Sequence, residues 1–358
     1  MHAPIVQTKN SAGMHYNPRP SLIAGSHLMW FKNLQLYRIT DLSKLNPNQL
    51  DAELQKRAFI PAASNERMAA GWIPPGSHAP DIFAYANSGA MLIALKTEEK
   101  LLPASVVKEM AEERIADIQD KELRKIGKKE AKEIRERIAD ELMPRAFSRS
   151  HVLRAIIDFE AGWIWVDTAS SSKAELLTQL LRETLGSLPT KLVQTQLDPV
   201  TAMSTWLEHD APPNFTLDAD CTLKAPGDSG AQVTCRRHDL SSDEVKLHLK
   251  SGKMVTQLAL SWDDRLSFVL NEKLQIKRLA FLDLLEDKIK DADAEDAAAM
   301  YDTTLTLLVQ EGRSLVNAVI DALGGELGES AMGSTAVPIA APPPAAKPAQ
   351  ASVVDVPW

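Results

Sequence analysis

The stretch VLRAIIDFEAGWIWVDT, residues 152–168, decides the fold class of this 358-residue chain. β-Branched and aromatic residues dominate it on both sides of Ala161 and Gly162. Such residues favour strands, and a short break containing glycine between two such runs is typical of a β-hairpin. We therefore predict two antiparallel strands, at 152–159 and 163–168.

Further strands surround this hairpin. A second hairpin is predicted at 82–95, where Asn87, Ser88 and Gly89 supply the turn. The remaining strands are expected at 30–39, 253–262, 265–270 and 273–279. Helical patterns lie between these strands, and hairpins build antiparallel sheets. The predicted class is therefore α+β, with antiparallel sheets, hairpins and helices packed on the sheets.

Capping signals locate the helices. Asn46 and Pro47 are a suitable cap and first residue for a helix over about 48–58. Boxes of the Ser-x-x-Glu type predict two more helix starts, and glycines predict the helix ends. The expected helices run from about 172 to Gly186, from about 241 to 251, from about 281 to 290, and from about 295 to 323.

The words GWIPPGSH, residues 71–78, predict an irregular loop. Two prolines remove amide donors, and two glycines widen the allowed backbone angles. This composition is unfavourable for a helix or a strand.

Residues 103–143 predict a helical arm. Their apolar positions recur at helical spacing in a strongly charged background, and Gly127 divides the pattern into two helices. A stripe this narrow packs by one side only, so the segment should project from the body. The stripe consists of Val107, Ala111, Ile115, Ile118, Ile126, Ile134, Ile138 and Leu142.

The ends of the chain differ from its middle. Residues 1–27 lack periodicity and are expected to be a disordered leader or a start-site extension, and the Pro- and Ala-rich residues 326–358 a disordered tail. Between them we expect an N-terminal α+β part (28–102), the arm (103–143) and a central and C-terminal α+β part (144–325).

Composition narrows the class of protein. The two cysteines, Cys221 and Cys235, fit no metal motif, which favours free thiols in a reducing cytoplasm. No apolar run reaches the roughly 18 to 20 residues of a membrane helix, so no membrane partner is expected. A net charge of −8 excludes a uniformly basic surface, but local basic patches remain compatible with it.

Catalytic motifs are weak. The sequence presents no convincing nucleophile with its base, no phosphate loop with its lysine and no metal-ligand cluster, so no catalytic residue, metal or other cofactor is predicted. The enzymatic alternative is a metal-dependent nuclease that uses Asp81 and Glu130. The plain alternative for Glu130 is a solvated helix face.

Positive charge gathers at a few places. Residues 121–137 hold eight Lys or Arg against four Glu, and Lys125, Lys128 and Lys129 lie at the predicted break of the arm. Further cations precede and follow predicted elements: Arg145, Arg149, Arg236, Arg237 with His238, and Lys253. Lys and Arg bind phosphate oxygens without reading bases, which indicates a nucleic-acid backbone as ligand.

Phe147 lies between Arg145 and Arg149 in the segment LMPRAFSRSH, residues 142–151. Pro144 should end the arm helix there. An aromatic ring among cations can present itself to bases, or it can be an apolar plug under the adjacent hairpin. The residues alone favour the plug.

Several unusual short motifs follow one another along the chain: WFKNL (30–34), GWIPPGSH (71–78), EEKLLP (98–103), LMPRAFSR (142–149), LGSLP (185–189) and the block from 239 to 253. Together they resemble the bacterial recombination-associated protein RdgC family, over about residues 28–325. The leader and the tail lie outside the resemblance.

The resemblance implies a subunit that pairs at both ends with a second copy, so that a ring-shaped homodimer encloses duplex DNA. It further implies a nucleoid-associated cytoplasmic protein that binds DNA without sequence preference and restrains RecA-type recombinase. Carried over by motif, Arg237, His238, Lys253, Arg145, Phe147 and Arg149 should lie near DNA. A third interpretation is a recombinase-interaction protein that uses the acidic residues 283–302, with incidental DNA binding.

Overall fold

The computed structural model describes residues 30–227, 230–281 and 297–328. Twelve strands form one antiparallel sheet path in the order β2-β4-β5-β6-β1-β12-β11-β10-β8-β9, with β3 on β4 and β7 on β1. The α+β class is confirmed. The strands are β1 (Asn33–Ile39), β2 (Met68–Ile73), β3 (Ala84–Asn87), β4 (Ala90–Leu101), β5 (Phe147–Asp158), β6 (Trp163–Val166), β7 (Thr190–Leu192), β8 (Phe215–Lys224), β9 (Gln232–Cys235), β10 (Met254–Trp262), β11 (Leu266–Asn271) and β12 (Ile276–Phe281).

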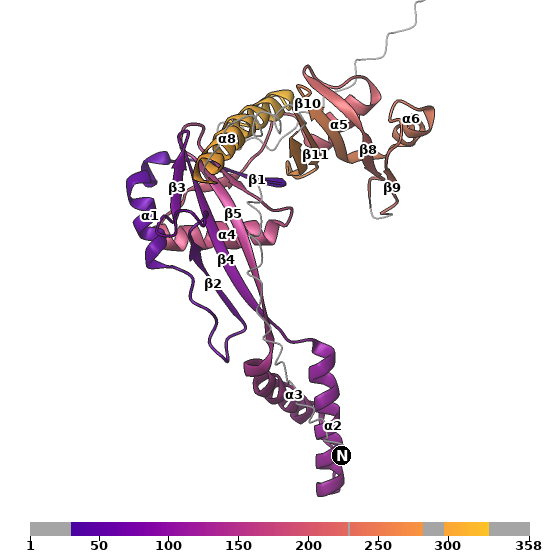
Figure 1. Ribbon diagram of the computed structural model, residues 1–358. Helices are drawn as coiled ribbons and strands as arrows, with labels where there is room; N and C mark the ends of the chain where they lie inside the picture. Colours follow the sequence, from indigo (N-terminus) through magenta and orange to yellow (C-terminus); the bar gives the residue numbers. More distant parts are fainter. Residues whose placement is uncertain (1–29, 228–229, 282–296, 329–358) are drawn as a thin grey trace, which may run out of the picture.

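The helices of the body cover both faces of this sheet (Figure 1). Two of them, α1 (Pro47–Lys56) and α4 (Ser171–Leu185), pack on one face of the N-terminal half, and α8 (Ala297–Ala322) packs on the other. In the C-terminal half, α5 (Pro199–Glu208) packs on β10, and α6 (Asp243–Lys250) lies beside it. The two halves join where β1 pairs with β12.

Burial on both faces explains the continuous apolar run of the first hairpin. Ala155 and Ile157 belong to the core under α1 and α4, whereas Ile156 belongs to the core under α8. All three are fully buried. Successive side chains of a strand point to opposite faces, so a strand covered on both sides needs apolar residues at every position.

The arm is the part of the fold that the sequence describes most completely. It consists of α2 (Ala104–Glu122) and α3 (Lys128–Leu142), which pack on each other, and it stands on the long strands β4 and β5 (Figure 1). Gly127 lies between the two helices as expected, where it is the N-cap residue of α3, and Leu123 turns the chain with a φ of 50°. All eight residues of the predicted stripe make the small core of the arm.

The predicted loop at 71–78 is wrong for its first three residues. Gly71, Trp72 and Ile73 lie in β2 and pair with β4. A Cβ on Gly71 would lie 2.4 Å from the backbone Cα of Phe59. Glycine here permits a close approach of two backbone segments, which is a known use of glycine inside strands. The prolines follow directly after the strand ends.

The strand of the opening stretch begins five residues earlier than predicted. β5 starts at Phe147, so Phe147, Ser148 and Arg149 are strand residues opposite β4 and not a connector. Partners on β4 supply the backbone hydrogen bonds that make this polar segment a strand. Pro144 lies just after the end of α3, as expected.

Both predicted capping boxes are wrong in their contacts. Helix α4 is preceded by Ser170 and α6 by Ser242, and neither side chain makes a capping hydrogen bond. Before α6, the carboxylate of Asp239 accepts the amide of Ser241 and shapes the turn instead. The N-cap Asn46, by contrast, accepts the amide of Asn48 and is confirmed.

Residues 187–240 hold elements that the sequence patterns did not reveal, namely β7, α5, β8 and β9. The helix predicted at 281–290 falls outside the described residues except for Phe281, which ends β12. The predicted leader lies outside them entirely, and so does the tail from residue 329 onward.

Candidate nucleic-acid interface

The tip of the arm presents three lysines to solvent. Lys125 lies in the turn between the two helices, and Lys128 and Lys129 open α3. All three are exposed, and none forms an ion pair with another described residue. Lysines at a helix N-terminus add to the positive end of the helix dipole, which is unfavourable for the free protein and favourable for a bound anion. This tip is suited to phosphate.

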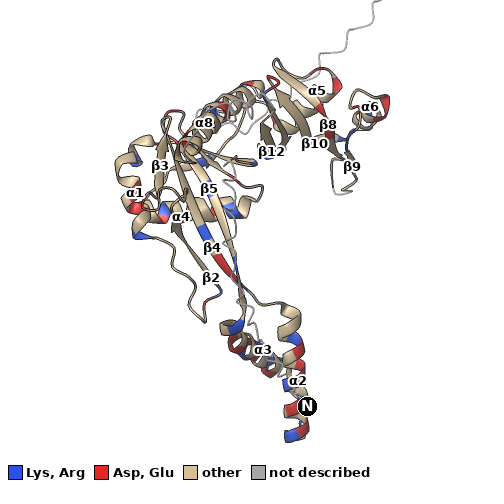
Figure 2. Cartoon of the chain, in the orientation of Figure 1, with Lys and Arg blue, Asp and Glu red and all other residues tan. Residues whose placement is uncertain are grey.

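The arm is not uniformly basic, because acidic residues alternate with the cations on both helices (Figure 2). Arg124 pairs with Glu122 and, through Nη1, with Glu130 Oε2 at 2.6 Å. Hydrogen bonding to Arg124 lowers the pKa of Glu130 below its usual value. Arg124 is thereby occupied within the protein, whereas the three lysines of the tip are available.

The pair proposed for a nuclease is not brought together. Glu130 lies on the arm, where Arg124 occupies both of its oxygens. Asp81 lies in the loop before β3, next to Gln55 of α1. Among the described residues, no group of three or more His, Cys, Asp or Glu is arranged to hold a metal ion. The metal site that the nuclease alternative requires therefore has no geometric support in the described part of the chain.

The base of the arm carries Arg145, Phe147 and Arg149, which are all exposed. Phe147 lies opposite Leu101 at the end of the β4–β5 ladder, and 84% of it is exposed. The interpretation of Phe147 as a plug is wrong, since a plug under the hairpin would be buried. The long hairpin carries the ring past the edge of the core, so it is presented to solvent between two cations.

Replacing Phe147 with alanine should leave the free energy of unfolding within about 0.5 kcal/mol, as expected for an exposed side chain. Ile157→Ala on the same strand is the matched control, because Ile157 is fully buried and its truncation should cost about 2 to 5 kcal/mol. Urea denaturation of both variants measures the difference. A decrease of more than about 2 kcal/mol in the free energy of unfolding of Phe147→Ala would instead support a buried, stabilising role for Phe147.

The second group of cations follows β9. Arg236 and Arg237 are exposed, and His238 is half-buried, with Nε2 3.6 Å from the carboxylate of Glu244. Arg237 has a φ of 51°, and its amide donates to Asp220 Oδ1 at 2.9 Å. The His238 amide donates to Ala219 O at 3.0 Å. Hydrogen bonds from these backbone amides to β8 thus hold the segment in place. The guanidinium groups of Arg236 and Arg237 take no part in these bonds.

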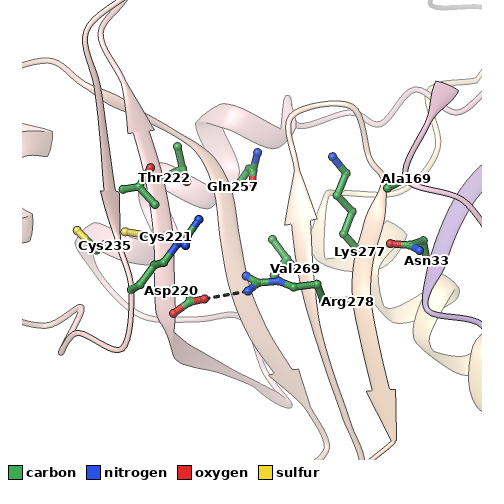
Figure 3. Close-up of a pocket in the computed structure, with 12 residues that line it drawn as sticks. Asn33, Ala169, Asp220, Cys221, Thr222, Cys235, Gln257, Val269, Lys277 and Arg278 are labelled. Carbon is green, nitrogen blue, oxygen red and sulfur yellow. Dashed lines mark hydrogen bonds and ion pairs between the residues drawn. The ribbon is translucent and has the colours of Figure 1, made fainter. Parts of the chain in front are cut away.

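Two cations that the sequence did not single out lie beside this segment. Lys277 and Arg278 of β12 line the same pocket as Arg236 (Figure 3). Adjacent strand residues normally point to opposite faces, but the β11–β12 register shifts here and Arg278 has a φ of 51°. Such a bulge re-aims a side chain. Residue alternation would have assigned one of the two cations to the other face.

Asp220 organises this pocket. One of its oxygens accepts the Arg237 amide, and the other lies 3.0 Å from Arg278 Nη1 (Figure 3). The bond from the Arg237 amide is the first cause that lowers the pKa of Asp220, and Arg278 and Arg236 add to it. The carboxylate therefore stays ionised near neutral pH and balances part of the local positive charge.

Lys253 lies at the far end of α6 from Arg237. Its ammonium group donates to Ser251 Oγ at 3.0 Å and lies 3.4 Å from His248 Nδ1. Because neither neighbour is a carboxylate, its charge is not neutralised by these contacts. Lys253 and the segment at 236–238 thus flank one short helix.

The lysines of the arm tip and the cations around α6 lie at opposite ends of the molecule. Figure 1 shows the arm projecting from one end and β9 with α6 at the other. The structure of a single chain does not bring the predicted DNA contacts into one site. It places Lys125, Lys128 and Lys129 at the arm tip, Arg145, Phe147 and Arg149 at the arm base, and Arg236, Arg237, His238 and Lys253 around α6.

Within the described residues, the structure contains no helix with both the length and the apolar character that a membrane span requires. The fold and the cations together define an elongated α+β protein with separate basic groups at its two ends. The chain belongs to the RdgC family: the family model described as "Putative exonuclease, RdgC" matches residues 29–326.

Similar proteins carry the name "Recombination-associated protein RdgC". The protein from Laribacter hongkongensis is 44% identical over 83% of this chain and 99% of its own length. The protein from Dechloromonas aromatica is 42% identical over 84% of this chain and 100% of its own length. The protein from Pseudomonas entomophila is 39% identical over 83% of this chain and 98% of its own length. These names associate the family with DNA recombination. The resemblance seen in the sequence motifs is confirmed.

Proposed function

We propose that this protein binds duplex DNA without sequence preference and thereby limits the access of a RecA-type recombinase. The observation that carries the proposal is the set of exposed cations without ion-pair partners among the described residues, at the arm and after β9. Lysine and arginine side chains that bind phosphate oxygens do not distinguish between bases. The recombination name of the relatives supports a role at DNA during strand exchange. The protein then works in the cytoplasm, on the nucleoid.

A second copy of the chain completes the proposed site. A homodimer that meets at both ends would form a ring around the duplex and gather basic groups that one chain keeps apart. Exposed leucines at both ends support this arrangement: Leu123 at the arm tip is 90% exposed, and Leu247 on α6 is 64% exposed. Large apolar side chains at such positions are suited to contact between subunits.

Salt titration tests the DNA binding. Affinity for several unrelated duplexes of equal length should agree within about threefold, and log K against log salt should fall with a slope of about −5 or steeper, since each phosphate contact contributes about −0.9. Fluorescence anisotropy between 50 and 300 mM salt measures both. A shallow slope, or a strong preference for one sequence, would overturn the proposal.

Nuclease activity is the second candidate, because the family description contains the word exonuclease. Incubation of end-labelled linear duplex and of supercoiled plasmid with Mg²⁺ or Mn²⁺ separates the two functions. We expect intact DNA. Degradation that disappears in Glu130→Gln would establish nuclease activity instead.

The alternative of recombinase contact through residues 283–302 concerns a segment that lies, for the most part, outside the described residues.

Substituting both Leu123 and Leu247 with glutamate should convert the dimer to monomer, because a charge at each end opposes both contacts. Leu192→Glu is the matched control, since Leu192 is 58% exposed on β7, away from both ends. Sedimentation velocity measures the mass. After a high-salt wash, the natural protein should stay on circular DNA and leave linear DNA. The monomeric double variant should leave both. A double variant that stays dimeric would contradict the ring contacts.

A further inference from the structure

The two cysteines of the chain face each other. Cys221 on β8 and Cys235 on β9 are direct partners in the antiparallel ladder, and both thiols are free. Figure 3 shows their side chains next to each other on adjoining strands. They are the only cysteines among the 358 residues. The pairing depends on the register of β8 and β9, which no spacing motif in the sequence reveals.

The backbone geometry of this pair is compatible with a disulfide. Directly opposite residues of antiparallel strands have Cα atoms about 4.5 to 5.5 Å apart. Disulfides span Cα distances of about 4.4 to 6.8 Å. The bond therefore needs little more than rotation of the two side chains. A reduced pair is the expected resting form in a reducing compartment, where disulfides are transient and serve redox sensing.

The pair is accessible to a small oxidant. Both cysteines line a pocket of 340 Å³ together with Arg236 and Arg278. Cys235 is half-buried, whereas Cys221 is buried. Burial is the main cause that raises the pKa of the Cys221 thiol to about 12. Because burial shields the Cys221 thiol and disfavours its thiolate, we expect the more accessible Cys235 to meet the oxidant first and Cys221 to react second.

We propose that Cys221 and Cys235 form a peroxide-responsive thiol pair that closes to an intramolecular disulfide. The Cys235 thiolate attacks one oxygen of hydrogen peroxide, the O–O bond breaks, and the departing hydroxide takes a proton to become water. The sulfur of Cys221 then attacks the sulfenic sulfur of Cys235. The S–O bond breaks, and hydroxide leaves with the Cys221 proton as a second water. The two thiols lose two electrons, and peroxide gains them.

The disulfide would act on the basic segment. β9 has four residues, lies at the end of the sheet order and, within the described residues, pairs with β8 alone. Cys235 is its last residue, and Arg236 and Arg237 follow directly. A bond to β8 at this point restricts the segment that carries the arginines. This consequence rests on the proposed DNA binding: pre-organised arginines lose less freedom on meeting phosphate.

Intact mass spectrometry of the full chain treated with hydrogen peroxide tests the chemistry. We expect loss of two hydrogen masses, monomeric chains on a non-reducing denaturing gel, loss of both alkylatable thiols, and reversal by dithiothreitol. In Cys221→Ser, Cys235 should accumulate sulfenic acid that dimedone traps. In Cys235→Ser, dimedone should label nothing. Persistently alkylatable thiols, a bond between two chains, or direct oxidation to sulfinic acid would overturn the proposal.

DNA anisotropy with the oxidised and the reduced protein tests the consequence. Oxidation should tighten binding about threefold through pre-organisation, and peroxide should leave the affinity of Cys221→Ser unchanged. Equal affinities of the two forms would overturn the regulatory role while the disulfide chemistry stands. If neither form binds DNA, the proposed function fails, and the mass measurement still decides whether the pair closes.

Discussion

A variant in which Lys125, Lys128, Lys129, Arg236 and Arg237 are replaced by glutamine will bind unrelated duplexes at least about a hundredfold more weakly than the natural protein at low salt. All five cations are exposed, and none has an ion-pair partner among the described residues. Each lost phosphate contact should also flatten log K against log salt by about 0.9, which sums to roughly four to five for the set. Anisotropy over a salt series measures both quantities.

The two groups can be tested separately. The three arm lysines and the two arginines should each account for part of the loss, equally for every duplex sequence. Lys44 and Lys173 form the matched control for the arm, because they are exposed lysines without an ion-pair partner among the described residues, on the side of the body that carries α1 and α4. Their replacement by glutamine should change affinity by less than about threefold. If the control variant lost as much DNA affinity as the arm variant, the net charge of the protein alone would explain the effect, and the arm lysines would not be a binding site.

Replacing Arg313 with leucine will destabilise the fold by about 3 to 5 kcal/mol, since it leaves a buried carboxylate without its partner. The Asp158 side chain is 0% exposed. Arg313 of α8 binds it with two hydrogen bonds of 2.8 Å, from Nε and from Nη2. This contact ties α8 to the end of β5. Denaturation in urea, followed by circular dichroism, measures the change in the free energy of unfolding.

Glu160 provides the control for this prediction. It also binds Arg313, at 2.6 Å, but it is 61% exposed. Exposed ion pairs contribute about 0 to 1 kcal/mol, so Glu160→Gln should have little effect. The double change Asp158→Asn with Arg313→Leu should recover part of the stability that Arg313→Leu loses. Similar costs for Arg313→Leu and Glu160→Gln would show that burial of Asp158 does not govern this contact.

The hairpin of residues 152–168 shows how far local patterns reach. Its strands and turn were predictable, because two runs of β-branched and aromatic residues on either side of a short break with glycine are a local hairpin signal. The arm was predictable for the same kind of reason: all eight stripe residues pack within α2 and α3, and no distant partner decides their places. The extension of β5 back to Phe147 was not, since its partner β4 lies about fifty residues away along the chain.

The candidate site divides in the same way. The basic character of 121–137 and 236–238 is visible in the composition, so the sequence indicated an anionic ligand. The exposure of Phe147, the occupation of Arg124 by two glutamates and the turned Arg278 were not visible. Each depends on how one strand or helix meets another, and a single window of sequence does not contain that information.

The sequence by itself determined the α+β class and the arm and led to the prediction of an anionic ligand, because periodicity, turn residues and charge are properties of short segments. Only the tertiary structure decided the placement of the basic groups at two ends, the facing of Cys221 and Cys235, and the burial of Asp158 under Arg313. The physical reason is strand register. A shift of one residue turns every side chain of a strand to the other face, and pairing between distant strands selects the register.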